Sequence, residues 1–435
     1  MGPELPAPSP WSVLPFLLLL AAIASGPLLL PRAWARHYPK ISFCLAAVTL
    51  AYYLFGLQAI SRVEHVAHEY ISFIVLIGAL FVVSGGIHIN VKGEAQPHVN
   101  VIYLLIGALA ANVLGTTGAS MLLIRPWIRM NRHRAAAHHI VFFIFIVSNV
   151  GGCLTPVGDP PLFLGYLKGI PFWWVAEHCW PMWAIAVAFL LLLFYAIDSA
   201  NYRRSPEKFR ERLAATHEEW RFEGSENIFF LLVILGAVFV KQPLLLREGL
   251  MLAAAAGSWS ATKKSIHAAN HFTFHPIAEV AILFFGIFAT MMPALDLVQA
   301  NAHRLGQPSP GSFFWGCGLL SSALDNAPTY LTFLSATLGL LAPAQNGLGP
   351  GGELGLAFLP GDPELTKFLV AISIGAVFFG ANTYIGNAPN FMVKSIADQQ
   401  KVPTPGFIGF SLKYALPCMA PLLVLLWLLF FRSNH

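Results

Sequence analysis

The sequence predicts an all-α polytopic membrane protein with about eleven transmembrane helices in two inverted repeats, each with a re-entrant hairpin and a broken helix. Hydrophobic residues make up 56% of the chain and charged residues only 11%, far below the roughly 25% of soluble domains. Several apolar runs are long enough to cross a hydrocarbon core of roughly 30 Å. Two distant stretches that interrupt such runs, residues 152–163 and 380–391, are similar to each other.

The first repeat is expected to occupy residues 1–200. No Lys or Arg precedes its first apolar run, whereas Arg32, Arg36 and Lys40 follow it, which is the reverse of a cleavable signal peptide. We therefore expect a retained first helix with its N-terminus outside the cytoplasm. The apolar runs of this half lie at about 12–31, 41–60, 70–90, 139–165 and 173–197.

The second repeat is expected to occupy residues 227–435, after a hydrophilic cytoplasmic linker at 201–226. An insertion rich in Gly and Pro, residues 343–365, is found in this half only and is expected to be a solvated loop on the outer side. The apolar runs of this half lie at about 277–300 and 406–431, with shorter runs at about 227–240 and 248–260.

The two similar stretches predict broken helices over residues 139–165 and 366–396. Each stretch carries a Gly, a Thr, a second Gly, a Pro and a Phe in register. Gly and Pro remove helical dihedral angles or hydrogen bonds, and non-helical backbone at membrane depth is tolerated only when it is buried in protein or lines a wet cavity. Paired interruptions of this kind indicate the binding site of a secondary transporter.

A small, polar segment precedes each broken helix, at Asn112–Ser120 and at Ser322–Tyr330. Apolar runs flank both segments, so we expect two short helices that meet at a polar tip, which is a re-entrant hairpin. The predicted hairpins span residues 99–125 and 312–342.

This topology places an excess of basic residues in the cytoplasm, as the positive-inside rule requires. The basic residues that it assigns to the outer side are Arg62, Lys168, Lys241, Arg247, Arg304 and Arg432. Those that it assigns to the cytoplasm are Arg32, Arg36, Lys40, Lys92, Arg125, Arg129, Arg132, Arg134, Arg203, Arg204, Lys208, Arg210, Arg212, Arg221, Lys263, Lys264, Lys394 and Lys401.

Two carboxylates lie at the interruptions: Asp159 in the first broken helix, and Asp325 at the second hairpin tip beside Asn326. A charge in the membrane costs about 2.5 to 3.5 kcal/mol on insertion scales, so such residues mark ion or proton paths. Oxygen ligands of this kind suit an alkali cation such as sodium better than a soft metal. Capping of half-helices by the two Asp residues is the structural alternative, and capping is compatible with ion binding. The neutral oxygen ligands at the interruptions are Thr116, Thr117, Ser120, Asn149, Thr155, Asn382, Thr383 and Asn387.

Other titratable residues indicate structure rather than a site. Asp198, Glu279 and Asp296 lie near predicted helix ends, where solvation is easy. The run Glu64–Glu69, with His65 and His68, is expected in an outside loop with no further ligand close in sequence, so zinc is not favoured. His138 and His139 open the first broken helix at the cytoplasmic face and can titrate near neutral pH; an interfacial pair is the expected role. The five cysteines are expected to be buried thiols.

Nothing in the sequence indicates an enzyme or a resident cofactor. The chain has no Gly-x-x-x-x-Gly-Lys run, so ATP-driven pumping is not expected. The net charge of +5 comes from loops and does not indicate nucleic acid. The expected partners are the lipid bilayer and small ions or a small organic anion, and a homodimer is left open.

The segments Ser148–Pro161, Asp325–Pro328 and Gly386–Asn390 resemble the ion transporter superfamily over residues 40–430. That superfamily includes NhaD-type sodium/proton antiporters, arsenite permeases, citrate/metal transporters and dicarboxylate/sodium symporters. The Gly-Gly-x-x-Thr-Pro-x-Gly-Asp and Asp-Asn-x-Pro patterns are most similar to NhaD-type antiporters. This resemblance implies Asp159, Asp325 and Asn326 as cation or proton residues. The chain is also similar to a less characterised citrate transporter group.

The resemblance implies a secondary active transporter of the cell inner membrane, with sodium/proton antiport by alternating access as the favoured function. Dicarboxylate symporters of the superfamily carry Ser-Asn-Thr at both hairpin tips, whereas these tips read Gly115–Gly118 and Asp325–Pro328. A tip carboxylate repels a di- or tricarboxylate unless a cation lies between them. A citrate-like symporter stays the main alternative, followed by an arsenite or oxyanion permease. The coupling ratio is left open.

Overall fold

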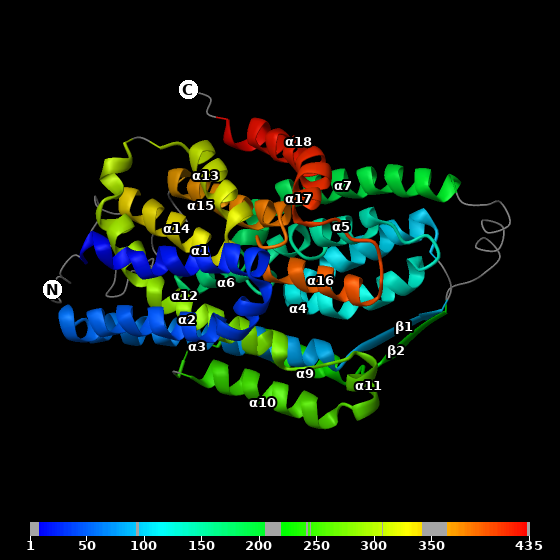
Figure 1. The fold of residues 1–435 in the computed structure, drawn as a ribbon, viewed down its shortest axis with the longest axis horizontal. Helices are drawn as coiled ribbons and strands as arrows, with labels where there is room; N and C mark the ends of the chain where they lie inside the picture. The colour runs from blue at the N-terminus through cyan, green and yellow to red at the C-terminus, as the bar shows by residue number, and fades with distance from the viewer. Residues whose placement is uncertain are drawn as a thin grey trace.

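The computed structural model describes residues 8–92, 95–204, 219–240, 242–243, 245–306, 308–341 and 363–432. These residues are helical over most of their length (Figure 1). In this part of the chain, 9 helices are long and apolar enough to cross a membrane. The protein is therefore an all-α polytopic membrane protein, as the composition predicts.

In the first half, the second and third helices begin before their apolar runs, at Pro31 and Ile60, and the last helix ends after its run, at Arg203, because polar residues continue these helices. The 3-10 turn Pro10–Val13 leads into the first helix, and the π-helical turn Tyr52–Gly56 continues the second. The helices are α1 (Leu14–Leu29), α2 (Pro31–Ala51), α3 (Ile60–Gly85), α4 (Pro97–Asn131), α5 (Ala137–Ile146), α6 (Pro160–Leu167) and α7 (Trp174–Arg203).

The second half begins with two helices that correspond to the two shorter apolar runs. π-Helical turns at Ser411–Ala415 and Trp427–Phe431 continue the last two helices. Most of the predicted insertion at 343–365 lies outside the described residues. The helices are α9 (Asn227–Val238), α10 (Leu246–Ala261), α11 (Lys264–Ala269), α12 (His275–Ala300), α13 (Pro310–Ala323), α14 (Asn326–Leu341), α15 (Pro363–Phe379), α16 (Ala388–Gln399), α17 (Phe407–Phe410) and α18 (Leu416–Leu426).

A two-stranded antiparallel sheet, which was not predicted, connects the two halves (Figure 1). Strand β1 (His88–Lys92) follows α3, strand β2 (Glu219–Glu223) precedes α9, and His88 lies opposite Glu223. The sequence interpretation placed the residues of β2 in a linker. The strand was not recognised because its partner, β1, lies far away in the sequence. Of that linker, residues 205–218 lie outside the described part of the chain.

Helix α4 folds back on itself at Gly115, which has a φ of 73° and a ψ of 155°. The Tyr103 hydroxyl donates to the Leu123 carbonyl oxygen at 2.7 Å across a separation of 20 residues. In a continuous helix that separation would be about 30 Å, so the two arms of α4 form a hairpin, which we call the first hairpin. Glycine suits its tip because only glycine adopts a positive φ without steric cost.

The second hairpin consists of α13 and α14, which meet at Leu324 and Asp325. Its two arms pack together through Phe313 and Phe333, whose ring centroids lie 5.2 Å apart. Asp325 Oδ1 accepts the backbone N–H of Ala327 at 3.1 Å, so this carboxylate caps α14, as the structural alternative supposes.

The two broken helices are the most enclosed membrane segments of the described chain. The buried share is 89% in Ala137–Leu154 and 83% in an 18-residue apolar stretch within Pro363–Asn382, against 17% in Pro10–Pro27. The non-helical backbone that follows α5 and α15 is thus shielded from lipid by protein, which is the condition for such backbone at membrane depth.

Candidate functional site

Each broken helix is interrupted by a 3-10 turn and an extended segment. After α5 come the turn Val150–Leu154 and then Thr155 and Asp159, both with extended backbone. After α15 come the turn Gly380–Asn382 and then Thr383 and Asn387, again extended. Both breaks end at a Pro in the first turn of the next helix, where the missing N–H costs nothing.

A pair of glycines lets the backbone cross itself closely in each break. A Cβ atom at Gly158 would lie 2.0 Å from the carbonyl oxygen of Gly152, and one at Gly386 would lie 2.5 Å from that of Gly380. No side chain fits in either place, so the glycines are required by close approach rather than by φ.

The threonine of each break joins the break to the hairpin of its own half. Thr155 Oγ1 donates to the Asn112 carbonyl oxygen at 2.5 Å and accepts from the Gly158 N–H at 3.0 Å. Thr383 Oγ1 donates to the Ser322 carbonyl oxygen at 2.7 Å and accepts from the Gly386 N–H at 3.0 Å. The two breaks thus share one hydrogen-bond pattern, and both hydroxyls, predicted as ion ligands, bind backbone.

Asp159 is the point where the four interruptions meet. Its Oδ1 accepts from the Thr116 hydroxyl at 2.8 Å and from Asn387 Nδ2 at 3.0 Å, and its Oδ2 accepts from Asn326 Nδ2 at 2.7 Å. The carboxylate is only 1% exposed. All three donors are neutral, and among the described residues no Lys, Arg or His forms an ion pair with it. The negative charge is therefore hydrogen-bonded but not neutralised.

Two buried oxygens beside Asp159 have no hydrogen-bond partner. They are Oδ1 of Asn326 and Oδ1 of Asn387, whose nitrogens both face the carboxylate. A buried acceptor left unpaired costs about 1 to 3 kcal/mol. Amide and carboxylate oxygens are the ligands that hard cations prefer, so these two oxygens and the charge of Asp159 fit a small cation.

A small cavity of about 20 Å³ lies next to Thr116 and Asp159. This volume holds about one water-sized particle. The lining residues come from α3, the first hairpin tip, the first break and α6: Leu76, Ile77, Leu80, Leu114, Gly115, Thr116, Thr117, Gly118, Pro156, Val157, Gly158, Asp159, Pro160 and Phe163.

The remaining predicted site residues lie close to this point without contacting Asp159. Thr117 lines the cavity. Asn149 Nδ2 donates to Asn390 Oδ1 at 2.7 Å, and Asn382 Nδ2 donates to the Ser322 hydroxyl at 2.9 Å. Asp325 lies at the second tip, next to Asn326, with its Oδ1 engaged in the cap of α14.

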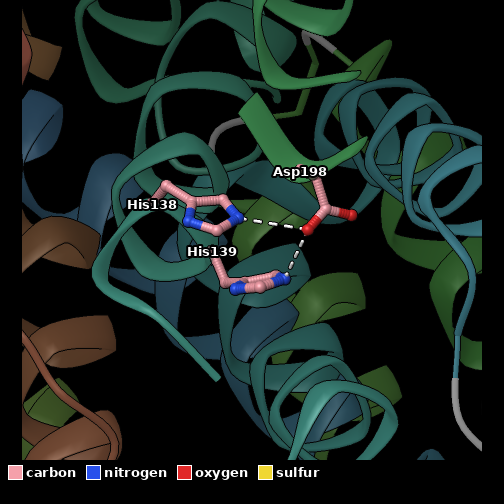
Figure 2. Close-up of side chains that lie close together, drawn as sticks. All are labelled: His138, His139 and Asp198. Atoms are coloured by element: carbon pink, nitrogen blue, oxygen red, sulfur yellow. Dashed lines mark hydrogen bonds and ion pairs between the residues drawn. The ribbon is translucent and has the colours of Figure 1, made fainter. Parts of the chain in front are cut away.

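A second buried polar group lies at the end of α7, where solvation was expected; that expectation for Asp198 is wrong. Helix α7 continues beyond the predicted end at 197 to Arg203, so Asp198 lies inside it and is 0% exposed. Figure 2 shows His138 and His139 with their Nε2 atoms toward Asp198 Oδ1, each at 3.1 Å. Both histidines are buried.

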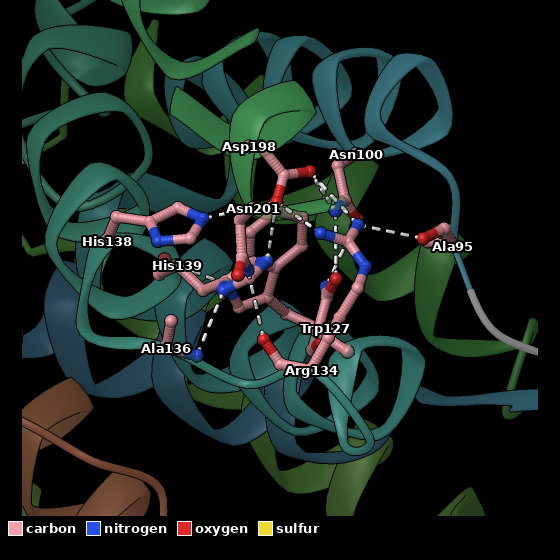
Figure 3. A network of polar contacts seen from close by, with 10 residues as sticks. Ala95, Asn100, Trp127, Arg134, Ala136, His138, His139, Asp198 and Asn201 are labelled. Atoms are coloured by element: carbon pink, nitrogen blue, oxygen red, sulfur yellow. Dashed lines mark hydrogen bonds and ion pairs between the residues drawn. The ribbon is translucent and has the colours of Figure 1, made fainter. Parts of the chain in front are cut away.

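Arg134 and Asn100 complete this group, which we call the Asp198 cluster together with His138, His139 and Asp198 (Figure 3). Arg134 Nη2 and Asn100 Nδ2 both donate to Asp198 Oδ2 at 3.0 Å, and Arg134 Nη1 pairs with Oδ1. The cluster joins the start of α4, the loop after it, α5 and α7. It was missed because its members lie 59 to 98 residues from Asp198.

The ligand atoms of His138, His139 and Asp198 lie within 4.8 Å of one another, which is close enough for a metal site. The Ala136 N–H, however, donates to His139 Nδ1 at 3.2 Å, so the ring hydrogen of neutral His139 is on Nε2, which lies 3.1 Å from Asp198 Oδ1. Arg134 also neutralises the carboxylate. The arrangement is thus a hydrogen-bonded ion pair.

The acidic and histidine run Glu64–Glu69 lies in α3, so its expected place in a loop is wrong. Glu69 is buried and pairs with Lys168 Nζ at 2.5 Å and with His65 Nε2 at 3.0 Å. Asp296 is likewise paired rather than freely solvated, because Arg62 Nη2 donates to it at 2.8 Å and Tyr53 Oη at 2.7 Å. Except for His65, which lies four residues before Glu69, these partners come from distant segments, which sequence spacing cannot reveal.

Residues 6–431 match a family model described as "Putative citrate transport". The chain belongs to this citrate transport family. Uncharacterized transporter Rv2685 of Mycobacterium tuberculosis (strain ATCC 25618 / H37Rv) is 22% identical over 426 residues, which cover 90% of this chain and 94% of that protein. Uncharacterized transporter Rv2684 of the same strain is 24% identical over 355 residues, covering 77% and 78%.

These matches confirm the resemblance that the motifs around Asp159, Asp325 and Asn387 carry, because the citrate transport family model covers nearly the whole chain. The relatives are named as transporters. With its long apolar helices, the protein is a membrane-embedded transporter of the citrate transport family.

Proposed function

We propose that this protein is a secondary active transporter that exchanges sodium for protons at Asp159 by alternating access. The observation that carries the proposal is the unneutralised, buried carboxylate of Asp159, which is hydrogen-bonded to two amides, Asn326 and Asn387, whose own oxygens are unpaired. A cation that binds there supplies the missing charge and occupies the missing acceptor contacts.

A proton is the natural competitor for this site. A carboxylate must be ionised to bind a cation strongly, so protonation of Asp159 removes the charge that holds sodium. If the site opens to one side of the membrane at a time, sodium and protons move in opposite directions. Asp325, at the tip beside Asn326, is proposed as the second residue of this exchange.

A citrate-like symporter is the second candidate, and the description of the family favours it. In that case a cation at Asp159 would lie between the protein carboxylate and the substrate carboxylate. The small cavity at Thr116 and Asp159 supports the inorganic ion. An organic anion, or an oxyanion such as arsenite, would need a cationic side chain at the site. In the described part of the chain, no Lys or Arg forms an ion pair with Asp159.

We propose the cell inner membrane as the location, with the N-terminus outside. The basis is the excess of Lys and Arg in the segments assigned to the cytoplasm.

Transport in sealed vesicles tests the proposal. Proton movement driven by a sodium gradient is compared with uptake of labelled citrate, with and without sodium. We expect sodium-driven proton movement without citrate, and its loss in Asp159→Asn, which keeps the side-chain shape and removes the charge. Folding should be retained, as judged by gel filtration and the melting temperature.

Asp398→Asn is the matched control, because Asp398 is an exposed carboxylate on α16 that pairs with Lys394. This variant should exchange sodium for protons at the normal rate. Sodium-dependent citrate uptake without proton exchange would overturn the antiport proposal in favour of symport. Normal exchange by Asp159→Asn would reduce Asp159 to a structural role.

A further inference from the structure

Asn387, one of the three donors to Asp159, is joined to two further amides in sequence. These are Asn149 in the first break and Asn390 in α16, and both are 0% exposed. Asn149 and Asn390 do not contact Asp159, yet they lie in one chain of hydrogen bonds that ends at its carboxylate.

The orientation of this chain is fixed at its far end. Asn390 Nδ2 donates to the carbonyl oxygens of Gly380 at 2.8 Å and Thr383 at 2.9 Å. A carbonyl oxygen can only accept, so the nitrogen of Asn390 must face the second break. Its Oδ1 is therefore left to accept from Asn149.

The same logic fixes Asn149. Its Nδ2 donates to Asn390 Oδ1 at 2.7 Å and to the Ile144 carbonyl oxygen, at the end of α5, at 2.8 Å. Its Oδ1 must then accept, and it does so from Asn387 Nδ2 at 3.3 Å.

Asn387 is thus oriented by Asn149 and by Asp159, which both accept from its nitrogen. Its Nδ2 faces acceptors only: Asn149 Oδ1, the Ser148 carbonyl oxygen at 3.1 Å and Asp159 Oδ1 at 3.0 Å. The Oδ1 atom of Asn387 is consequently the one that has no partner. The carbonyl oxygens of Gly380 and Thr383 therefore fix the orientation of Asn390, which fixes Asn149, which in turn fixes Asn387 with its Oδ1 free for the site.

We propose that Asn149 and Asn390 are positioning residues that set the sodium affinity of the site by orienting Asn387, an inference that rests on the proposed cation exchange. They act without touching the ion. Asn149, expected from sequence to be a ligand, serves one step behind the ligand. Because the chain crosses from α5 to α16, it also holds the two breaks in a fixed relation while the ion is bound.

The test replaces Asn390 by Leu, which has a similar shape and no polar atoms, and Asn149 by Ser, whose hydroxyl is too short to bridge both neighbours. Initial rates of exchange in sealed vesicles are measured against sodium and against lithium concentration. Loss of outer-shell partners typically costs 10- to 100-fold in metal affinity, so we expect the KM for sodium to rise about tenfold or more, with the maximal rate little changed. The ratio of sodium to lithium KM should shift, since the angle of one ligand oxygen is no longer fixed.

Asn301→Leu is the matched control, because Asn301 Nδ2 donates to the Leu297 carbonyl oxygen at the end of α12, away from both breaks. It should keep the normal KM values. Wild-type KM values and a wild-type ion ratio in both variants, or a lower maximal rate at constant KM, would overturn the positioning role. If Asn390→Leu does not fold, Asn149→Ser decides by the same criterion. Absence of sodium exchange in the wild type would instead overturn the proposed function.

Discussion

Asp159 combines a charge, deep burial and neutral donors, and each property restricts what the residue can do. The three donors stabilise the ionised form, but they add no positive charge. An isolated buried charge is expensive unless it is paired or bound to a cation. The residue is therefore suited to alternate between a bound cation and a bound proton.

Replacement of Asp325 by Asn tests whether a second carboxylate takes part in this exchange. In the wild type, the KM for sodium should rise as the pH falls, because a proton on either carboxylate removes a charge that attracts the cation. The limiting dependence is about tenfold per pH unit for one competing proton. Asp325→Asn should flatten this dependence and raise the KM for sodium at alkaline pH.

The measurement is the initial exchange rate in vesicles at several sodium concentrations and at a series of pH values. A sodium KM that is constant from acid to alkaline pH in the wild type would speak against antiport. It would favour the citrate-like symporter.

The choice of Asp159 could be made from sequence because a carboxylate between Gly158 and Pro160 in an apolar run is a local signal. Its partners could not be chosen in this way. Asn326 and Asn387 lie 167 and 228 residues away, and the direction of an amide depends on all of its neighbours. For the same reason, sequence could not show that the hydroxyls of Thr155 and Thr383, which are of a type that can bind a cation, donate to backbone carbonyl oxygens instead.

At the scale of the elements, the breaks depend on glycine pairs that leave no room for a side chain. Gly158→Ala places a Cβ 2.0 Å from the Gly152 carbonyl oxygen, which is backbone and cannot move aside. We expect a loss at or above the usual 1 to 3 kcal/mol of overpacking, seen as a lower melting temperature and as lost exchange.

Gly249→Ala in α10 is the control for this prediction. A Cβ at Gly249 meets nothing within 4 Å, and Ala in a helix is favoured over Gly by about 0.5 to 1 kcal/mol. Its melting temperature should be unchanged or higher. A melting temperature for Gly158→Ala equal to that of Gly249→Ala would show that the break can relax.

The Asp198 cluster ties α4, α5 and α7 together, and its loss should destabilise the first half of the protein. Asp198→Asn leaves Arg134 buried without a counter-charge, which typically costs about 3 to 5 kcal/mol. Denaturant unfolding in detergent measures this loss. The double variant Arg134→Leu with Asp198→Leu should lose less than the sum of the two single Leu variants, because neither charge remains unpaired. Additive losses would contradict a direct ion pair.

Composition and the apolar runs predicted an all-α membrane protein with several long helices because apolar length, Gly and Pro are local properties. They did not locate β1 and β2, whose pairing joins residues 88–92 to 219–223. They also ended α7 before Asp198, because an Asp in an apolar helix is plausible only once Arg134, His138 and His139 are known to face it.

At the scale of the whole molecule, the two hairpins are predicted to enter the membrane from opposite sides. Single cysteines at His98, at the start of α4, and at His303, before α13, test this; both positions are exposed. Cys44 is exposed, so the expectation of a buried thiol is wrong at this position, and it is first replaced by Ser. An impermeant maleimide should label position 98 only from the cytoplasmic side and position 303 only from the outer side. Labelling of both from one side would exclude inverted hairpins.

The hydrogen bonds that the Asp159 carboxylate accepts also join the two halves of the protein. Asp159 and Thr116 belong to the first half, whereas Asn326 and Asn387 belong to the second. Any motion that separates the halves at this point must break bonds to the carboxylate, and such bonds weaken when the acceptor loses its charge, since charge-assisted bonds are roughly twice as strong as neutral ones. For the proposed exchange, this means that the ionised carboxylate strengthens the hydrogen bonds that join the two halves at Asp159, and that a proton on Asp159 weakens them.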